Sequence, residues 1–440
     1  MTEPTDNSPA SSPSVLHHDG NRDDQWLRPA RVLGLVAGRA VFRLTTYGAG
    51  IVLLAIWGAT EFASFAAPVG ATGWVLIAVG GIEKAAQTFL PRDPRRVLER
   101  FFLLAAIVPY VLLVLVSVVV SAASPDSELA TYVAAAALAC GVGTASATVA
   151  LFRMRDRPGL DALTYLHLSV GYVGCVVVVA WLGLGVLPLF MLLLGWQTFA
   201  VGVLLARFLG NRIGVGGNAS LRWEALRAIP LLSAGDLASA VGVSVLYVEL
   251  SWGADQRELS TFYVAAVLLT VAAMVWTYLL RLAQPTLVRR LASGKGHRDV
   301  SLGRRVASLS AATGIIVTVA AAAMAWWAGP DEMVLVAAVV VLEPLLYIGA
   351  SLGIFVLENF DARSRRLAAA AAIPELVTVV VVGAALAPRW GATGALVAVC
   401  AGQTAKSAAA FAVLSSVDPA QAATAPRSVA QTSTAGGAAR

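Results

Sequence analysis

The chain has 440 residues, of which 58% are hydrophobic and only 13% charged, and its mean hydropathy is +0.76. Soluble globular proteins average about 45–50% apolar and about 25% charged residues, so this composition excludes a water-soluble globular chain and predicts a polytopic membrane protein. The formal net charge of +6 would indicate nucleic-acid binding in a soluble protein. Here the distribution of the charges explains it better, and we expect no nucleic-acid partner.

Both ends of the chain are polar. The first thirty or so residues lack the apolar core of a signal peptide. We predict a disordered cytoplasmic tail over residues 1–38 and a second one over residues 415–440. The three cysteines, Cys140, Cys175 and Cys400, lie within apolar runs, so the sequence indicates neither a disulfide framework nor a metal site.

Twelve apolar runs have the roughly 20 residues that a helix needs to cross a bilayer. Breaks at charges, prolines and glycines place them near residues 39–57, 69–89, 101–123, 129–151, 162–183, 186–207, 227–250, 261–284, 306–328, 333–357, 367–387 and 391–414. We therefore predict an all-α polytopic membrane protein of about twelve transmembrane helices.

The positive charges test this count, because they concentrate in the cytoplasmic loops of membrane proteins. With the N-terminus inside, only Arg257 and Arg389 of the 32 Lys and Arg residues fall in outer connections. The outer connections are short and acidic. A wrong count would scramble this alternation, so the pattern predicts that both termini are cytoplasmic.

Two local matches indicate a duplication. A-Q-x-x-L-x-R occurs at residues 86–92 and again at 283–289, and a Gln-Thr pair follows twelve residues after Gly185 and after Gly391, at Gln197 and Gln403. These matches pair span 2 with span 8 and span 6 with span 12. Parallel repeats of six helices are an architecture of alternating-access transporters. We predict an N-lobe over residues 39–207, a cytoplasmic linker over 208–226 and a C-lobe over 227–414, around a central cavity.

Sequence features disfavour an enzyme. The outer connections are too short for a catalytic domain, the four histidines are scattered, and no G-x-x-x-x-G-K-[ST] phosphate loop occurs. We expect no catalytic residues, no cofactor and no bound metal.

Two segments carry a family resemblance: "EFASFAAPVGATGWVLIAVGGIEKAAQTFLPR" at residues 61–92 and "PRWGATGALVAVCAGQTAKSAAAFAVL" at 388–414. They resemble the multidrug/oligosaccharidyl-lipid/polysaccharide (MOP) exporter superfamily, and within it the polysaccharide exporters that flip lipid-linked oligosaccharides of the O-antigen type. The resemblance implies a V-shaped pair of six-helix lobes. It also implies a polar, often cationic cavity for a polyprenyl-diphosphate sugar, with transport driven by an ion gradient or the membrane potential.

Ionisable residues inside membrane spans are costly and are candidates for binding substrate or ions. Arg43, Glu83 and Lys84 lie near the inner ends of spans 1 and 2. Long side chains at such positions can extend to the interface. An interfacial anchor is therefore at least as good an interpretation for these three as ligand contact.

The second lobe holds a deeper set. Asp236, Glu375 and Lys406 lie at similar depth in the predicted spans. A buried lysine needs an acidic partner, so we predict that Lys406 pairs with Glu375 or Asp236, either as a structural bridge or as a switchable ion-coupling pair. Glu343 precedes Pro344, which frees a helix carbonyl and favours a polar site.

Gln197 and Gln403 fit either inter-helix packing or a shared role in the cavity. The leading hypothesis is a flippase that carries a lipid-linked glycan precursor across a bacterial plasma membrane. A cation-coupled multidrug exporter of the same superfamily is the alternative. A third hypothesis is a flippase-like scaffold that binds envelope-assembly proteins. The expected partners are the bilayer, the glycan lipid and, for an exporter, a coupling cation.

Overall fold

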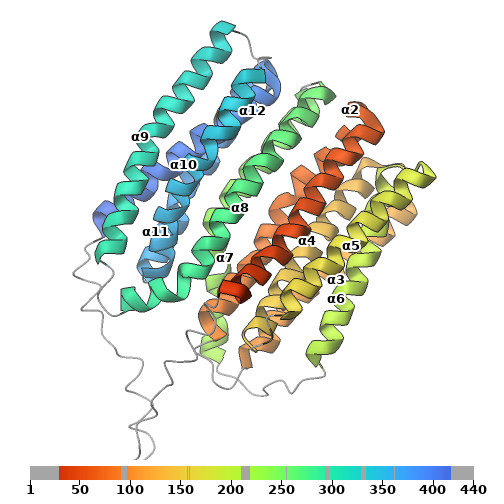
Figure 1. Ribbon diagram of the computed structural model, residues 1–440, viewed down its shortest axis with the longest axis horizontal. Coiled ribbons are helices and arrows are strands. Elements are labelled where there is room, and N and C mark those ends of the chain that lie inside the picture. Colours follow the sequence, from red (N-terminus) through yellow and green to blue (C-terminus); the bar gives the residue numbers. More distant parts are fainter. Residues whose placement is uncertain are drawn as a thin grey trace, which may run out of the picture.

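The computed structural model describes residues 29–90, 97–155, 157, 159–209, 219–253, 255–292, 297–328, 333–360 and 362–417. These ranges contain helices and no strand, which confirms the all-α prediction. In Figure 1 the helices α2 to α6 lie on one side, α9 to α12 on the other, and α7 and α8 between them. The bounds are α2 (Pro29–Phe89), α3 (Val97–Ala123), α4 (Glu128–Arg153), α5 (Gly159–Leu182), α6 (Val186–Leu209), α7 (Ala219–Gly253), α8 (Gln256–Ala292), α9 (His297–Ala328), α10 (Met333–Phe360), α11 (Ala362–Ala371) and α12 (Ile373–Ser416).

Ten spans in the described ranges are long and apolar enough to cross a bilayer. Two of them, Ala37–Phe89 with 53 residues and Arg363–Ser416 with 54, are more than twice the length of one crossing. Each folds back at a glycine with positive φ: Gly58 (φ 74°) in the first and Gly391 (φ 52°) in the second. Counted by halves, the ten spans supply twelve crossings, which agrees with the predicted number and describes a multi-pass membrane protein.

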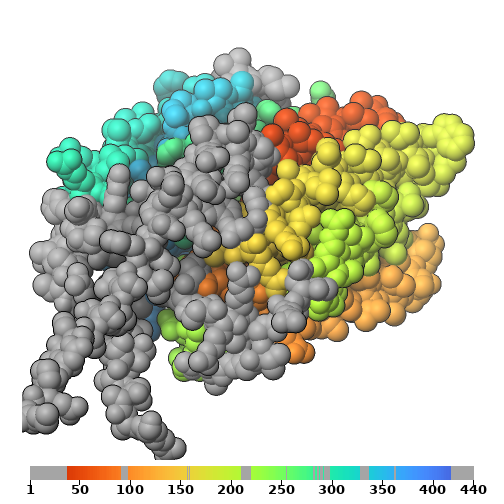
Figure 2. Space-filling view, turned by 60° about the horizontal axis from the view of Figure 1, so that its bottom comes forward, coloured from red at the N-terminus to blue at the C-terminus, as the bar shows by residue number. Residues whose placement is uncertain are grey.

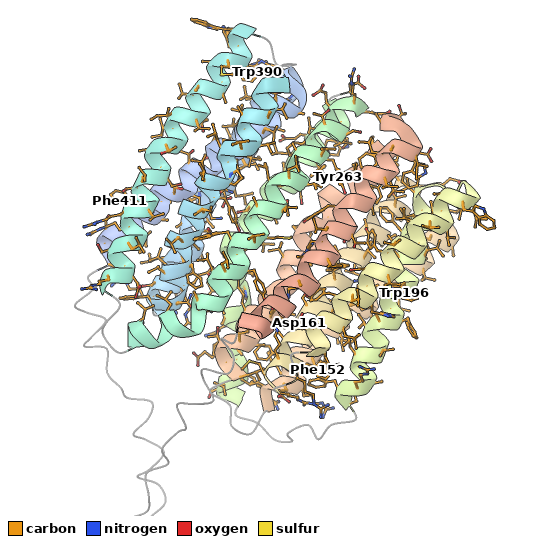
Figure 3. All side chains as sticks on the ribbon, in the orientation of Figure 1. Phe152, Asp161, Trp196, Tyr263, Trp390 and Phe411 are labelled. Carbon is orange, nitrogen blue, oxygen red and sulfur yellow. The ribbon has the colours of Figure 1, made fainter. Side chains whose placement is uncertain are left out.

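Ion pairs show that both long helices fold back at these glycines. Arg39 and Glu83 are 44 residues apart in α2, yet their side chains are 3.2 Å apart. A straight helix would separate them by about 66 Å. Both turns carry the same four residues, Trp-Gly-Ala-Thr, at 57–60 and at 390–393. Figure 3 shows Trp390 at the opposite end of the molecule from Asp161.

The turn within α12 depends on two glycines. Gly391 has a φ that only glycine adopts easily, and a Cβ at Gly394 would overlap the Leu386 carbonyl oxygen. The Glu258 carboxylate at the start of α8 accepts a 2.8 Å hydrogen bond from the Ala392 amide. This carboxylate caps the second half of α12, where the helix dipole favours a negative charge.

We call the end of the molecule where α2 begins and α12 ends the basic face, and the other end the opposite face (Figure 1). Helices extend beyond their predicted bounds at the basic face. Helix α7 begins at Ala219, within the predicted linker over 208–226, and the role of this segment as a cytoplasmic linker stays a prediction. Helix α2 likewise begins within the predicted tail over 1–38, at Pro29, and α12 ends at Ser416. The predicted disorder of residues 1–28 and 418–440 lies outside the described residues.

The hydrophobic core differs between the two ends. Toward the opposite face one cluster joins both lobes and contains aromatic residues of each, such as Phe62, Phe65, Phe262 and Tyr263. Toward the basic face there are two separate clusters, one in α2 to α6 that also takes in the beginning of α7, and one in α8 to α12. Figure 2 shows the basic face, with the colours of the N-terminal half on one side and those of the C-terminal half on the other.

Candidate functional site at the junction of the lobes

Helix α2 joins the two lobes through Lys84. The Lys84 ammonium lies 3.1 Å from the Asp236 carboxylate of α7 and 3.5 Å from the Glu358 carboxylate of α10. It also donates a 2.8 Å hydrogen bond to the Leu232 carbonyl oxygen of α7. The three charged side chains are 13%, 30% and 10% exposed. Lys84 is therefore a cation of the first lobe held by two acids of the second.

Lys406 of α12 reaches the same part of α7 from within the second lobe. Its ammonium lies 2.9 Å from Glu375 and donates to the Gly235 carbonyl oxygen at 3.2 Å and to the Ser239 hydroxyl at 2.8 Å. The Ser239 hydroxyl donates to Glu375, and so does the Gln403 amide. Both charged side chains are almost fully buried. Neutralising one partner would leave the other charge buried, which typically costs about 3–5 kcal/mol.

The backbone of α7 therefore accepts from both lysines. The Leu232 and Gly235 carbonyl groups already lie in the ladder of α7, but a carbonyl oxygen has a second lone pair for a lysine. Small residues surround this point, with the sequence Ser-Ala-Gly between 233 and 235. A Cβ at Gly235 would lie 3.2 Å from Ile354 of α10. The stretch 232–239 is thus a close-packed polar junction of α2, α7, α10 and α12.

Glu343 of α10 is a buried acid of the second lobe that has an unsatisfied oxygen atom. Its side chain is 4% exposed, and its Oε2 atom has no hydrogen-bond partner among the described residues. Pro344 follows it within the helix. A buried carboxyl oxygen without a donor is costly, so Glu343 is the part of the second lobe best suited to bind a proton or a cation.

A second charge network closes the first lobe at the basic face. Arg153 at the end of α4 lies 2.6 Å from Glu83 and 3.0 Å from Asp161 of α5. Arg39 lies 3.2 Å from Glu83 and 3.5 Å from Asp161. Figure 3 shows Asp161 near the lower end of the molecule. Two arginines and two acids therefore alternate across four crossings.

The predicted partner of Lys406 is present, since the structure pairs it with Glu375. Asp236 instead pairs with Lys84. The interfacial interpretation is wrong for Glu83, which is 2% exposed and bound to arginines, and for Lys84, which extends between the lobes rather than to the interface. Both side chains stay inside the protein because each has an oppositely charged partner within reach. Arg43 is half-buried, with its guanidinium 5.9 Å from the centre of the Phe42 ring.

The two matched glutamines differ in their surroundings. Gln403 belongs to the Lys406 cluster. Gln197 is 3% exposed and packs against α4, where a Cβ at Gly141 would lie 2.7 Å from its amide nitrogen. Packing therefore describes Gln197, and whether the two share a role in transport stays a prediction.

Four charged residues of these networks escaped the sequence analysis. They lie at the first residue of a predicted span or one to two residues beyond its limit, where hydropathy alone indicates a helix end or a loop: Arg39, Arg153, Asp161 and Glu358. The helices extend further and bring all four inside the bundle. The signal that could have indicated these pairs was the presence of opposite charges at the inner ends of neighbouring predicted spans.

The contacts between the lobes change in character along the molecule. Toward the opposite face they are close and apolar: the Phe62 and Tyr263 rings are 5.1 Å apart, and a Cβ at Gly70 would overlap the Tyr247 ring. Toward the basic face they are ionic, with Lys84 on its acids and the Arg39 guanidinium 5.6 Å from the Tyr278 ring. The two lobes are thus joined by aromatic side chains at one end. At the other end they are joined by ion pairs and by the apolar residues Ala225, Ala228 and Leu232 of α7, which pack on the first lobe.

Comparison with family models finds no match, and comparison with curated proteins finds none. Solved structures match over most of their length. An inward-facing multidrug resistance MATE family transporter of the MOP superfamily has a TM-score of 0.55 at 10% identity, covering 86% of this chain and 93% of that one. The MATE multidrug transporter DinF-BH has a TM-score of 0.55 at 13% identity, covering 86% of this chain and 93% of that one.

The chain has the fold of these MATE family transporters. An outward-facing MATE family transporter has a TM-score of 0.52 at 12% identity, covering 87% of this chain and 93% of that one. Within this fold, the polar junction on α7 lies where the two lobes meet. The described residues contain no group of three or more His, Cys, Asp and Glu side chains placed to hold a metal ion.

Proposed function

We propose that this chain is a membrane transporter that moves its substrate by alternating access between two six-crossing lobes. The observation that carries the proposal is the change in the lobe contacts from aromatic at the opposite face to ionic at the basic face. A transporter of this kind needs one end that stays closed while the other opens. The MATE fold supports the same proposal.

Magnitudes favour opening at the basic face from the described state. The ion pairs of Lys84 are mostly buried. Desolvation of the charges offsets most of the attraction within such a pair, so parting it into water, where both charges are hydrated again, costs little. Exposing one buried aromatic side chain to water costs about 2 kcal/mol, and the core at the opposite face contains several from each lobe. Ala225, Ala228 and Leu232 of α7 also pack on the first lobe at the basic face, but they are smaller than the aromatic residues and expose less apolar area. Parting the lobes at the basic face is therefore cheaper than parting them at the opposite face.

We propose a lipid-linked oligosaccharide or polysaccharide precursor as the substrate, taken from the cytoplasmic leaflet of a bacterial plasma membrane to the outer leaflet. Lys84 supports an anionic head group, because once its pairs with Asp236 and Glu358 have parted it is a cation of the first lobe at the end of the lobe junction that opens most cheaply. The arginines of the basic face support the orientation, since positive residues concentrate on the cytoplasmic side.

A cation-coupled multidrug exporter is the second candidate. The unsatisfied carboxyl oxygen of Glu343 favours it, because a proton or cation there would remove the cost of its burial. The multidrug transporters with the same fold support it too. A scaffold for envelope-assembly proteins would need the basic face but no movement of the lobes.

Deletion of the gene separates these functions. Accumulation of a lipid-linked sugar intermediate in the cytoplasmic leaflet, reversed by the wild-type chain but not by Lys84→Gln, is the result we expect. Unchanged lipid-linked sugars together with new sensitivity to cationic drugs would overturn the flippase in favour of the exporter. Full complementation by Lys84→Gln, with the protein still required, would favour the scaffold.

A further inference from the structure

A pocket of about 300 Å³ lies on the basic face, outside the junction on α7. We call it the arginine pocket. Its walls come from the end of α2, the first three turns of α7 and the short helix α11, and its main residues are Phe89, Trp223, Arg227, Leu231, Arg365 and Arg366. Three arginines and one acid, Glu224, line it, which leaves a net positive charge. We propose that the arginine pocket binds the phosphate group of an anionic lipid.

The chemistry of the lining fits a phosphate. Arginine presents a planar fork of donors that matches phosphate oxygens and is more weakly hydrated than an ammonium group. Arg227 and Arg366 are exposed, so their charges remain accessible from the face, and Arg365 beside them is half-buried. A volume of about 300 Å³ lies at the lower end of ligand pockets. It therefore takes a head group rather than a whole lipid.

The position of the pocket fits a lipid rather than a free phosphate. The span at α7 is 34 residues long, which corresponds to about 51 Å, whereas the hydrocarbon core measures about 30 Å. Helix α7 therefore extends well beyond the hydrocarbon. Its exposed apolar side chains at this end, Trp223 with 54% and Leu226 with 42% exposed, belong at the head-group level.

An aromatic residue beside the arginines also supports the placement of the pocket at the head-group level of the membrane. The Arg227 guanidinium lies 4.9 Å from the centre of the Trp223 ring. Such pairing keeps a cation at an amphipathic ring, which is favoured where water meets lipid. Phe89 of the first lobe and α7 and α11 of the second enclose the pocket together. A bound head group thus contacts both lobes.

The test measures lipid binding by the purified full chain, so it does not depend on transport or on the identity of the substrate. The variant Arg227→Gln/Arg365→Gln/Arg366→Gln removes the three charges. The matched control Arg298→Gln/Arg304→Gln/Arg305→Gln removes three charges from exposed positions of α9 at the same face. Native mass spectrometry in neutral detergent gives the dissociation constant for phosphatidic acid and for the zwitterionic lipid phosphatidylcholine. Thermal unfolding confirms that each variant is folded.

We expect the pocket variant to lose at least ten-fold in affinity for phosphatidic acid, because each arginine near an anionic lipid surface contributes about a five-fold gain. The control and phosphatidylcholine binding should change less than two-fold. Equal losses in both variants would show unspecific attraction and overturn the proposal, as would unchanged binding in the pocket variant. Inorganic phosphate is the second arm: arginine-dependent binding of phosphate without phosphatidic acid binding would overturn the lipid as its source.

Discussion

Lys84 and Lys406 come from the first and the last crossing pairs of the chain, yet both donate hydrogen bonds to one stretch of α7, at the Leu232 and Gly235 carbonyl oxygens. Lys84 crosses between the lobes, whereas Lys406 stays within the second. A shift of α7 therefore alters the contacts of both lysines. This arrangement makes α7 the element that couples the lobe junction to the buried cluster of Lys406 and Glu375.

Lys84→Gln tests the inter-lobe ion pairs. The substitution leaves the largely buried Asp236 and Glu358 without their cation, so it should lower the free energy of unfolding by up to about 3 kcal/mol. Transport should fall at least ten-fold, because the basic face loses its closing contact. Complementation of a deletion strain and thermal unfolding measure the two effects. Arg157→Gln, an exposed change at the same face, should leave both unchanged. Equal activity of Lys84→Gln and the wild type would contradict the role of Lys84.

Lys406→Met tests the buried pair in the second lobe. It leaves the Glu375 carboxylate without its cation, which should lower the free energy of unfolding by about 3–5 kcal/mol. The double variant Lys406→Met/Glu375→Gln should recover most of this loss, since no buried charge remains. Chemical unfolding in detergent checks the values.

Transport by the double variant then separates the two roles of the pair. Full activity would identify a structural bridge, whereas a stable but inactive protein would identify a pair whose charges are used in transport. A Lys406→Met single variant as stable as the wild type would contradict the pairing itself.

Gly391→Ala tests the fold-back turn of α12. Alanine at φ 52° is strained, and its Cβ would meet the Glu258 carboxylate that caps the following helix. We expect a loss of about 1–3 kcal/mol in the free energy of unfolding. The control is Gly195→Ala in α6, where a Cβ would meet nothing within 4 Å. There alanine should be neutral or stabilise by up to about 1 kcal/mol. A larger loss at Gly195 than at Gly391 would refute the assignment of the turn.

Arg153→Gln tests the charge network of the first lobe. Glu83 and Asp161 would each lose their shorter ion pair while remaining buried. We expect a loss of about 3 kcal/mol in the free energy of unfolding. The expected loss of structure is local, so limited proteolysis should show earlier cleavage at the end of α4 and the start of α5, where Arg153 and Asp161 lie. Stability within about 0.5 kcal/mol of the wild type would show that Arg39 alone satisfies both acids.

The number and approximate position of the membrane crossings could be predicted from the sequence, because the length of apolar runs and the alternation of charge are local properties. It also indicated that Lys406 requires an acid. It did not indicate which acid, because pairing Glu375 rather than Asp236 depends on how α12 folds back and which side of α7 it meets. The networks of Arg39, Arg153 and Asp161 escaped for a related reason. Hydropathy ends a span at the first charge, whereas a paired charge allows the helix to continue inside the protein.

The repeated Trp-Gly-Ala-Thr illustrates a signal that was present and overlooked. Its two copies occupy the two fold-back turns, at 57–60 and 390–393. The requirement for positive φ at Gly58 and Gly391 explains the glycines. The close contact of Gly70 with Tyr247 could not be read from the sequence, because it depends on the approach of the two lobes.

The distance between the lobes at each end tests the central claim most directly. Spin labels at positions 157 and 304 report on the basic face, and labels at 129 and 327 report on the opposite face, in a background with Cys140, Cys175 and Cys400 replaced. All four labelled positions are exposed. We predict that Lys84→Gln lengthens the distance from 157 to 304 and leaves the distance from 129 to 327 unchanged. An unchanged distance at the basic face, or lengthening at both ends together, would contradict an ionic contact that closes one end of an alternating-access transporter.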